Sequence, residues 1–178
     1  MVNIVIGSWG SYNECNERAL GSKWLDLSDY SDWEEIEEEL RSEGFDLDGI
    51  DEELFIQDIE GLPSDSTNWD YFHPKKLFEL LLEADVLNDK YKNEVMCAYL
   101  EIQGLESFLS LVEDDGSQWD WDIHIWRGYD WYDLGYELLH EGNDIPDYLD
   151  NYIDYKRFGE ELSYEGFHEY SGGIIEIR

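Results

Sequence analysis

The sequence predicts an α+β protein, because short runs that alternate apolar and polar residues occur toward both ends of the chain and helical periodicity dominates between them. Changes in charge and composition divide the chain into three small modules: a mixed strand and helix module at residues 1–64, a helical module at 65–112, and a second mixed module at 113–178. The 178 residues suffice for one ordinary domain or for two or three small ones.

The first module contains three strand-like runs. Residues 3–9 alternate and predict a strand, residues 10–16 are rich in turn formers, and residues 23–27 predict a second strand. After an acidic loop at 46–53, residues 54–59 predict the strand that closes a small sheet.

One helix is expected between these strands. Ser31 and Glu34 fit a capping box, and an apolar stripe follows at helical spacing, namely Trp33, Ile36 and Leu40. At about 100° per residue, a row of glutamates points away from that stripe: Glu34, Glu35, Glu38 and Glu39. The helix is therefore expected to present a carboxylate face to water.

The middle module is helical and less acidic. Turn residues at 63–68 mark its start, Pro74 opens one helix, and Asn88 can cap a second. Residues 69–112 hold four basic residues against eight acidic ones, a milder balance than in the flanking modules.

The last module returns to strong acidity. Alternation at 119–125 predicts a strand with Trp119, Trp121, Ile123 and Ile125 on one side. Asp130 can cap a helix at 131–141, and Gly142 can end it. Pro146 is expected to start another helix with one acidic face formed by Asp147, Asp150 and Asp154, and residues 173–177 predict a final strand.

The net charge is the strongest functional signal. The 45 Asp and Glu against 11 Lys and Arg give −34, yet 42% of residues are hydrophobic and 16% aromatic, so the chain should fold despite its self-repulsion. Anionic membranes and nucleic acid would both repel such a surface. The N-terminus lacks the features of a signal peptide, no apolar stretch approaches the roughly 20 residues of a membrane span, and Cys15 and Cys97 suit free thiols. We therefore expect a cytoplasmic protein.

Catalytic and metal-binding motifs are not found. The Asp-rich loops around Gly49 and Gly116 fail the twelve-residue calcium pattern, and the histidines have no metal-ligand spacing, so no metal or cofactor is expected. One alternative is a small carbohydrate-active hydrolase that uses tryptophans beside carboxylates, such as Trp126, Asp130, Trp131 and Asp133. Another is an acidic chaperone for basic proteins.

The carboxylates are spread along whole faces, which favours an imitation of DNA charge by a protein that is not an enzyme. Duplex DNA carries one charge per roughly 1.7 Å of axis, so 34 charges correspond to about 17 base pairs. The residues predicted to bind a partner are Asp32, Glu34, Glu35, Glu38, Glu39, Asp46, Asp48, Asp51, Glu52, Glu53, Asp114, Asp115, Asp120, Asp122, Asp133, Glu137, Asp147, Asp150 and Asp154.

Two segments resemble the ArdA antirestriction proteins. Residues 12–27 contain a Tyr-Asn followed by Leu-Gly-x-x-Trp, and residues 151–162 read NYIDYKRFGEEL before a Gly-rich approach to a closing Ile-x-Glu-Ile. The resemblance implies an elongated three-module chain that dimerises through its C-terminal module. It also implies a DNA mimic, encoded by a mobile element, that binds type I restriction-modification enzymes in a bacterial host. The acidic stretch at 46–53 and the Trp-rich segment at 119–131 depart from the family pattern.

Overall fold

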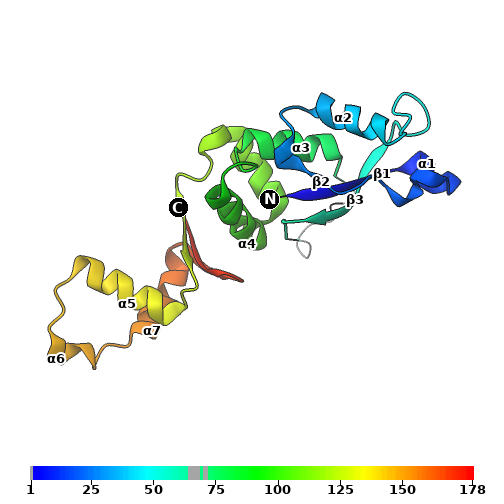
Figure 1. Cartoon of the computed structure of the whole chain (residues 1–178). Helices are drawn as coiled ribbons and strands as arrows, with labels where there is room; N and C mark the ends of the chain where they lie inside the picture. Colours follow the sequence, from blue (N-terminus) through cyan, green and yellow to red (C-terminus); the bar gives the residue numbers. More distant parts are fainter. Residues whose placement is uncertain (1, 64–68, 70–71) are drawn as a thin grey trace. The chain divides into compact units, whose positions relative to one another are not determined.

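The computed structural model describes residues 2–63, 69 and 72–178 and confirms the α+β class (Figure 1). The chain divides into two compact units, Met1–Trp119 and Asp120–Arg178, and each contains one three-stranded antiparallel sheet. Residues 64–68 of the turn expected at 63–68 lie outside the described residues. The boundary expected between residues 112 and 113 falls inside helix α4 (Lys90–Asp115). The division into three modules stays a prediction.

The first sheet is centred on the N-terminal strand. Strand β1 (Asn3–Ser8) pairs antiparallel with β2 (Leu25–Asp26) on one side and with β3 (Leu54–Glu60) on the other. The strands expected at 3–9 and 54–59 are therefore confirmed. The run at 23–27 contributes only two residues, because Asp26 accepts a hydrogen bond from the Ser28 amide at 3.0 Å and starts the 3-10 turn η2 (Leu27–Asp29).

A short helix replaces the turn expected at 10–16. Helix α1 (Trp9–Glu14) starts at Ser8, whose hydroxyl accepts from the Ser11 amide, and the 3-10 helix η1 (Glu17–Leu20) follows it. The indole of Trp9 stacks on Phe55, with 4.1 Å between ring centroids. Six residues are too few to show helical periodicity in the sequence, and this packing on β3 holds the helix in place.

Helix α2 (Trp33–Ser42) buries the predicted stripe of Trp33, Ile36 and Leu40. Its N-cap is Asp32, which accepts from the Glu35 amide at 3.0 Å, so the capping box expected for Ser31 and Glu34 is wrong. The Glu35 carboxylate accepts from the Ser31 amide at 2.8 Å instead. These two hydrogen bonds join different residues to Glu35, so they do not form a reciprocal capping box.

The two middle helices are confirmed. Helix α3 (Pro74–Glu83) begins after His73, whose Nδ1 accepts from the Lys75 amide. Helix α4 is capped by Asp89 and not by Asn88. Gly104 interrupts α4 with φ 79° and ψ 175°, a conformation that L side chains rarely adopt.

Among the described residues, one segment is long and apolar enough to cross a membrane by length and composition only. It is Lys90–Gln118, with mean hydropathy 1.3 in its most apolar window, of which 39% is buried. The expectation that no apolar stretch approaches this length is therefore wrong. Gly104 divides α4 into two pieces, each shorter than the roughly 20 residues of a span, and Phe108 packs edge-on against the buried Trp119. We describe α4 as a core helix.

The second unit packs helices on its own sheet. Strand β6 (Gly173–Ile177) lies between β4 (Ile123–Arg127) and β5 (Phe167–Tyr170). Of these three strands, β5 was not predicted from the sequence. Helices α5 (Trp131–Gly142) and α7 (Tyr155–Glu161) cross so closely that a Cβ on Gly135 would lie 2.0 Å from the Tyr155 carbonyl oxygen. The core below them contains Leu134, Leu162, Phe167 and Ile174.

Two expectations for this unit are wrong. The strand begins only at Ile123, because Trp119 is buried in the first unit with Nε1 donating to the Ala84 carbonyl at 2.9 Å, and Trp121 lies in a turn with 75% of its surface exposed. The helix expected after Pro146 is the single turn α6 (Asp147–Asp150), and Asp154 caps the separate helix α7.

Candidate partner-binding surface

Acidity is shared evenly between the two units. Residues 1–119 contain 30 acidic and seven basic residues, and residues 120–178 contain 15 and four, which gives net charges of −23 and −11. The charge per residue is thus nearly equal. Both units, and not one special module, carry the acidic surface.

Most of the carboxylates predicted from the sequence are exposed. The exposed set is Asp32, Glu34, Glu35, Glu38, Asp46, Asp48, Glu52, Glu53, Asp114, Asp115, Asp122, Asp133, Glu137, Asp147 and Asp154. Glu39, Asp120 and Asp150 are half-buried, and Asp51 is buried. Exposure is necessary for partner binding, so Asp51 does not belong to this surface.

The acidic face of α2 is smaller than predicted. Glu39 forms an ion pair with Lys23, and this hydrogen bond lowers the pKa of the Glu39 carboxyl and raises that of the Lys23 ammonium. Glu35 accepts from the Ser31 amide. Within the described residues, Glu34 and Glu38 have no ion-pair or hydrogen-bond partner, so these two carboxylates are the ones free to meet a cation.

The acidic loop at 46–53 is held from inside by Asp51. This residue is 1% exposed, and its carboxylate accepts from the Ser11 hydroxyl and, at 2.8 Å, from the Asp46 amide. Asn16 donates to the same Ser11 oxygen at 2.9 Å. Asp51 therefore positions the exposed carboxylates of Asp46 and its neighbours without joining them.

The ionisation of Asp51 follows from these contacts. Burial raises its pKa, but the hydrogen bonds that it accepts, the one from Ser11 first, outweigh burial and leave the pKa below its ordinary value. The carboxylate is therefore charged at neutral pH. No sequence pattern indicates this role, because Ser11 lies forty residues away along the chain.

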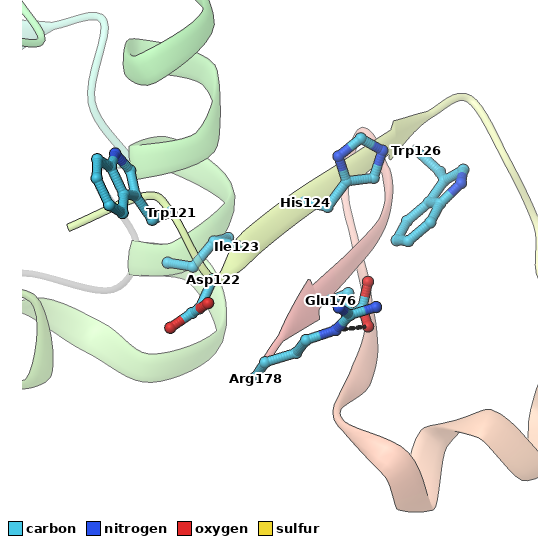
Figure 2. Close-up of a pocket in the computed structure, with 7 residues that line it drawn as sticks. All are labelled: Trp121, Asp122, Ile123, His124, Trp126, Glu176 and Arg178. Atoms are coloured by element: carbon cyan, nitrogen blue, oxygen red, sulfur yellow. Dashed lines mark hydrogen bonds and ion pairs between the residues drawn. The ribbon is translucent and has the colours of Figure 1, made fainter. Parts of the chain in front are cut away.

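Asp122 lies at a hollow of about 310 Å³ in the second unit (Figure 2). Trp121 and Trp126 lie at opposite ends of the hollow, and His124 packs edge-on against Trp126 with 4.4 Å between centroids. The carboxylate of Glu176 is buried and pairs with Arg178. The lining therefore offers no pair of free carboxylates for acid and base catalysis.

The residues considered for a carbohydrate-active site serve a structural purpose. Asp130 accepts from the Tyr132 and Asp133 amides at 2.8 and 3.0 Å, and the Asp133 carboxylate accepts from the Asp130 amide at 3.3 Å. These two aspartates form the capping box of α5, as expected for Asp130. Asp133 is still exposed, so it can contribute charge to the surface.

The acidic row expected on one helix does not form. Asp147 is exposed at α6, Asp154 accepts from the Arg157 amide at 3.1 Å, and Asp150 accepts from the Tyr155 hydroxyl at 2.6 Å. Burial, with the hydrogen bond to Asp150 second, raises the pKa of Tyr155 to about 12. The single acidic helix face expected for Asp147, Asp150 and Asp154 is therefore wrong.

Sequence reasoning missed an aromatic stripe on α5. Tyr132, Tyr136 and His140 occur at steps of four residues, and Tyr132 and Tyr136 are 49% and 41% exposed. Their spacing is the signal that could have found them. Tyr148 and Tyr152, in and after α6, are 73% and 86% exposed.

No cluster of three or more His, Cys, Asp or Glu side chains suited to a metal ion occurs in the part of the chain that the structure describes. Cys15 and Cys97 are free thiols, and burial raises the pKa of Cys97 to about 11. At neutral pH that thiol stays protonated and unreactive.

A family model described as antirestriction protein (ArdA) matches residues 4–176. No curated protein matches the chain. The family match runs through both compact units and includes every carboxylate predicted above.

Proposed function

Because the chain belongs to the ArdA family of antirestriction proteins, we propose that it acts as a DNA mimic. Its exposed carboxylates occupy the DNA-binding groove of a type I restriction-modification enzyme and exclude DNA from it. Incoming mobile DNA is thereby protected in the cytoplasm of the bacterial host. Antirestriction follows from the family, and mimicry is the mechanism that the charges favour.

The observation that carries this proposal is the even spread of exposed charge. Net charges of −23 and −11 on the two units correspond to nearly the same charge per residue. A groove that binds duplex DNA presents Lys and Arg along a length of many phosphates, and a protein acidic over its whole chain can meet many of them. A discrete catalytic site would concentrate its carboxylates instead.

The state of individual carboxylates supports binding over catalysis. Asp130 and Asp133 cap a helix, Glu176 pairs with Arg178, and Asp51 is buried on Ser11. Glu34 and Glu38 project into water without partners among the described residues. These two unpaired carboxylates lie on an open face of α2, which does not enclose a substrate.

The proposed partner is the methyltransferase core of the enzyme, because that part holds the DNA. We further propose that the chain acts as a homodimer through residues 113–178. Neither nucleic acid nor membrane is expected to bind it directly, since both share its sign of charge.

A pull-down of a type I methyltransferase core tests the proposal. The protein should capture the core stoichiometrically, and a duplex carrying the recognition site should compete with it. The double variant Glu34→Lys, Glu38→Lys should compete less well, and Lys75→Glu serves as a control that increases the acidity. Simultaneous binding of protein and duplex to one core would reject direct mimicry.

A further inference from the structure

The second unit carries a hollow of about 520 Å³ on one side of α5, distinct from the one that contains Asp122. Three tyrosines line it, Tyr129, Tyr132 and Tyr136, together with the side chains of Asp133, Glu137 and Arg127. The two carboxylates each follow a tyrosine directly in the sequence, so rings and negative charges alternate along the helix. Because Arg127 contributes one positive charge against the two carboxylates, the lining keeps a net negative charge.

The rings of Tyr132 and Tyr136 pack against each other and against His140 and Tyr155, an arrangement called the tyrosine ladder below. Tyr132 and Tyr136 are nearly parallel, with 6.5 Å between centroids and 20° between planes, and Tyr136 stacks on His140 at 4.0 Å. Tyr155, which is 3% exposed, meets Tyr132 and Tyr136 edge-on at 5.8 and 5.1 Å. Its hydroxyl donates to Asp150, so the supporting ring cannot turn freely. Tyr132 and Tyr136 are nevertheless 49% and 41% exposed, so part of each side chain remains accessible to a partner.

The chemistry of the lining selects a cation that is also flat. An aromatic face attracts a cation within about 6 Å of its centroid, and a guanidinium can stack on the ring while its N–H groups pair with a carboxylate. A lysine ammonium lacks the planar fork. A nucleotide would stack but bring phosphate into a strongly negative field, and a lipid headgroup with phosphate meets the same repulsion. Within the described residues, Glu137 has no ion-pair or hydrogen-bond partner and can accept such a fork.

We propose that the hollow beside Tyr132 and Tyr136 is a recognition slot for an arginine side chain of a protein partner. The proposal rests on the proposed function, because the partner's DNA-binding groove supplies the arginine. Tyrosine and carboxylate together offer the guanidinium a flat aromatic face to cover and an anion to bind. The slot therefore adds a shape-specific contact to a surface that otherwise acts through charge.

The test compares two peptides of equal charge, tetra-arginine and tetra-lysine, on the intact protein by calorimetric titration. Both bind an acidic surface anywhere, so the quantity that matters is the ratio of their affinities. We expect the double variant Tyr132→Leu, Tyr136→Leu to lower the arginine preference by about two- to fivefold, the range for exposed cation–π contacts. Tyr164→Leu, at a side chain that is 90% exposed outside the hollow, should leave the ratio unchanged.

A second variant avoids any change in ring packing. Glu137→Gln should weaken tetra-arginine binding by about two- to fivefold, and Glu165→Gln, the same chemical change at an exposed residue outside the hollow, should weaken it less. Near-ultraviolet circular dichroism checks that all variants keep the fold.

An arginine preference that survives the double tyrosine variant, or equal effects of the two glutamine variants, overturns the slot. Sedimentation of the double tyrosine variant tests whether a second copy of the chain occupies the hollow instead. If the variant converts a dimer to a monomer, a second copy covers the hollow, and the proposed arginine slot is overturned. Failure of the methyltransferase core to bind, with the peptide results intact, removes the proposed function but not the arginine site. Failure of the peptides alone removes the site but not the mimicry.

Discussion

Removing the carboxylate of Asp51 is expected to destabilise the first unit even though it lowers the self-repulsion of the chain. The perturbation is Asp51→Ala. It takes away the acceptor for the Ser11 hydroxyl and the Asp46 amide, and it leaves the hydroxyl of Ser11, a fully buried residue, without its acceptor. Asp48→Ala is the matched control, because its side chain is 89% exposed and forms only a 3.6 Å ion pair with Arg41.

The magnitude follows from these contacts. Hydrogen bonds to a charged group contribute about 1.5–3 kcal/mol each, and a buried donor left unpaired costs about 1–3 kcal/mol. Both bonds share one carboxylate and the lost repulsion offsets part of the effect, so we expect a decrease in the free energy of unfolding of about 2–4 kcal/mol. With a urea dependence near 2 kcal/mol/M, the midpoint should fall by roughly 1–2 M.

The pH dependence has a definite sign. The folded pKa of Asp51 is lower than the value near 3.9 of an unfolded aspartate, so the unfolded state binds the proton more readily. The stability that Asp51 contributes is therefore complete above about pH 4 and is lost as the pH falls through the folded pKa. The difference in the free energy of unfolding between wild type and Asp51→Ala should be constant between pH 6 and 8 and should become smaller below about pH 4.

Urea titrations followed by tryptophan fluorescence measure these differences. Asp48→Ala should shift the free energy of unfolding by less than about 0.5 kcal/mol in either direction. If Asp51→Ala were as stable as Asp48→Ala at neutral pH, the buried carboxylate would not hold the loop, and the account of residues 46–53 given above would be wrong.

Three further outcomes are expected. Binding to a methyltransferase core should weaken steeply as salt rises, because screening reduces the pairing of carboxylates with Lys and Arg; equal affinities at low and moderate salt would contradict this. Reversing Glu34 and Glu38 together should weaken that binding about tenfold or more, while each single change costs little, as competition titrations can measure. The proposed homodimer should instead become more stable as salt rises, because screening reduces the repulsion between the two chains and leaves apolar burial nearly unchanged. A sedimentation series that shows a monomer at every salt concentration would exclude this dimer.

Regular periodicity made much of the fold predictable. Alternation found β1 and β3, and helical spacing found the buried stripe of α2 and the cap of α5 at Asp130. The failures occur where local pattern competes with distant contacts. Helix α1 depends on the Trp9 ring, which stacks on Phe55. Trp119 is not part of the strand predicted for it, because its indole donates a hydrogen bond to the Ala84 carbonyl, 35 residues away along the chain.

The sequence predicted that the surface is strongly acidic, but it predicted less well which individual carboxylates are exposed and unpaired. Helical spacing predicted one exposed face for Glu34, Glu38 and Glu39 alike, but it could not show that Lys23, sixteen residues away along the chain, forms an ion pair with Glu39. Asp51 has the same chemistry as its exposed neighbours, and only the tertiary position of Ser11 buries it. The tyrosine ladder was missed because the sequence of α5 was considered only for its cap at Asp130 and its end at Gly142, and not for the spacing of its aromatic residues.

The use of aspartates as helix caps changes the field that the protein presents. In the part of the chain that the structure describes, four α-helices begin at an aspartate: Asp32 for α2, Asp89 for α4, Asp130 for α5 and Asp154 for α7. Each carboxylate there faces the positive end of a helix macrodipole, equivalent to about half an elementary charge, which partly cancels its potential. Asp114 and Asp115 lie at the C-terminal end of α4, where the macrodipole is negative and adds to their charge, although the Lys92 ammonium donates to the nearby Ser117 carbonyl at 2.6 Å. A count of formal charges therefore overstates the negative potential at the four helix caps relative to that of carboxylates at helix C-termini.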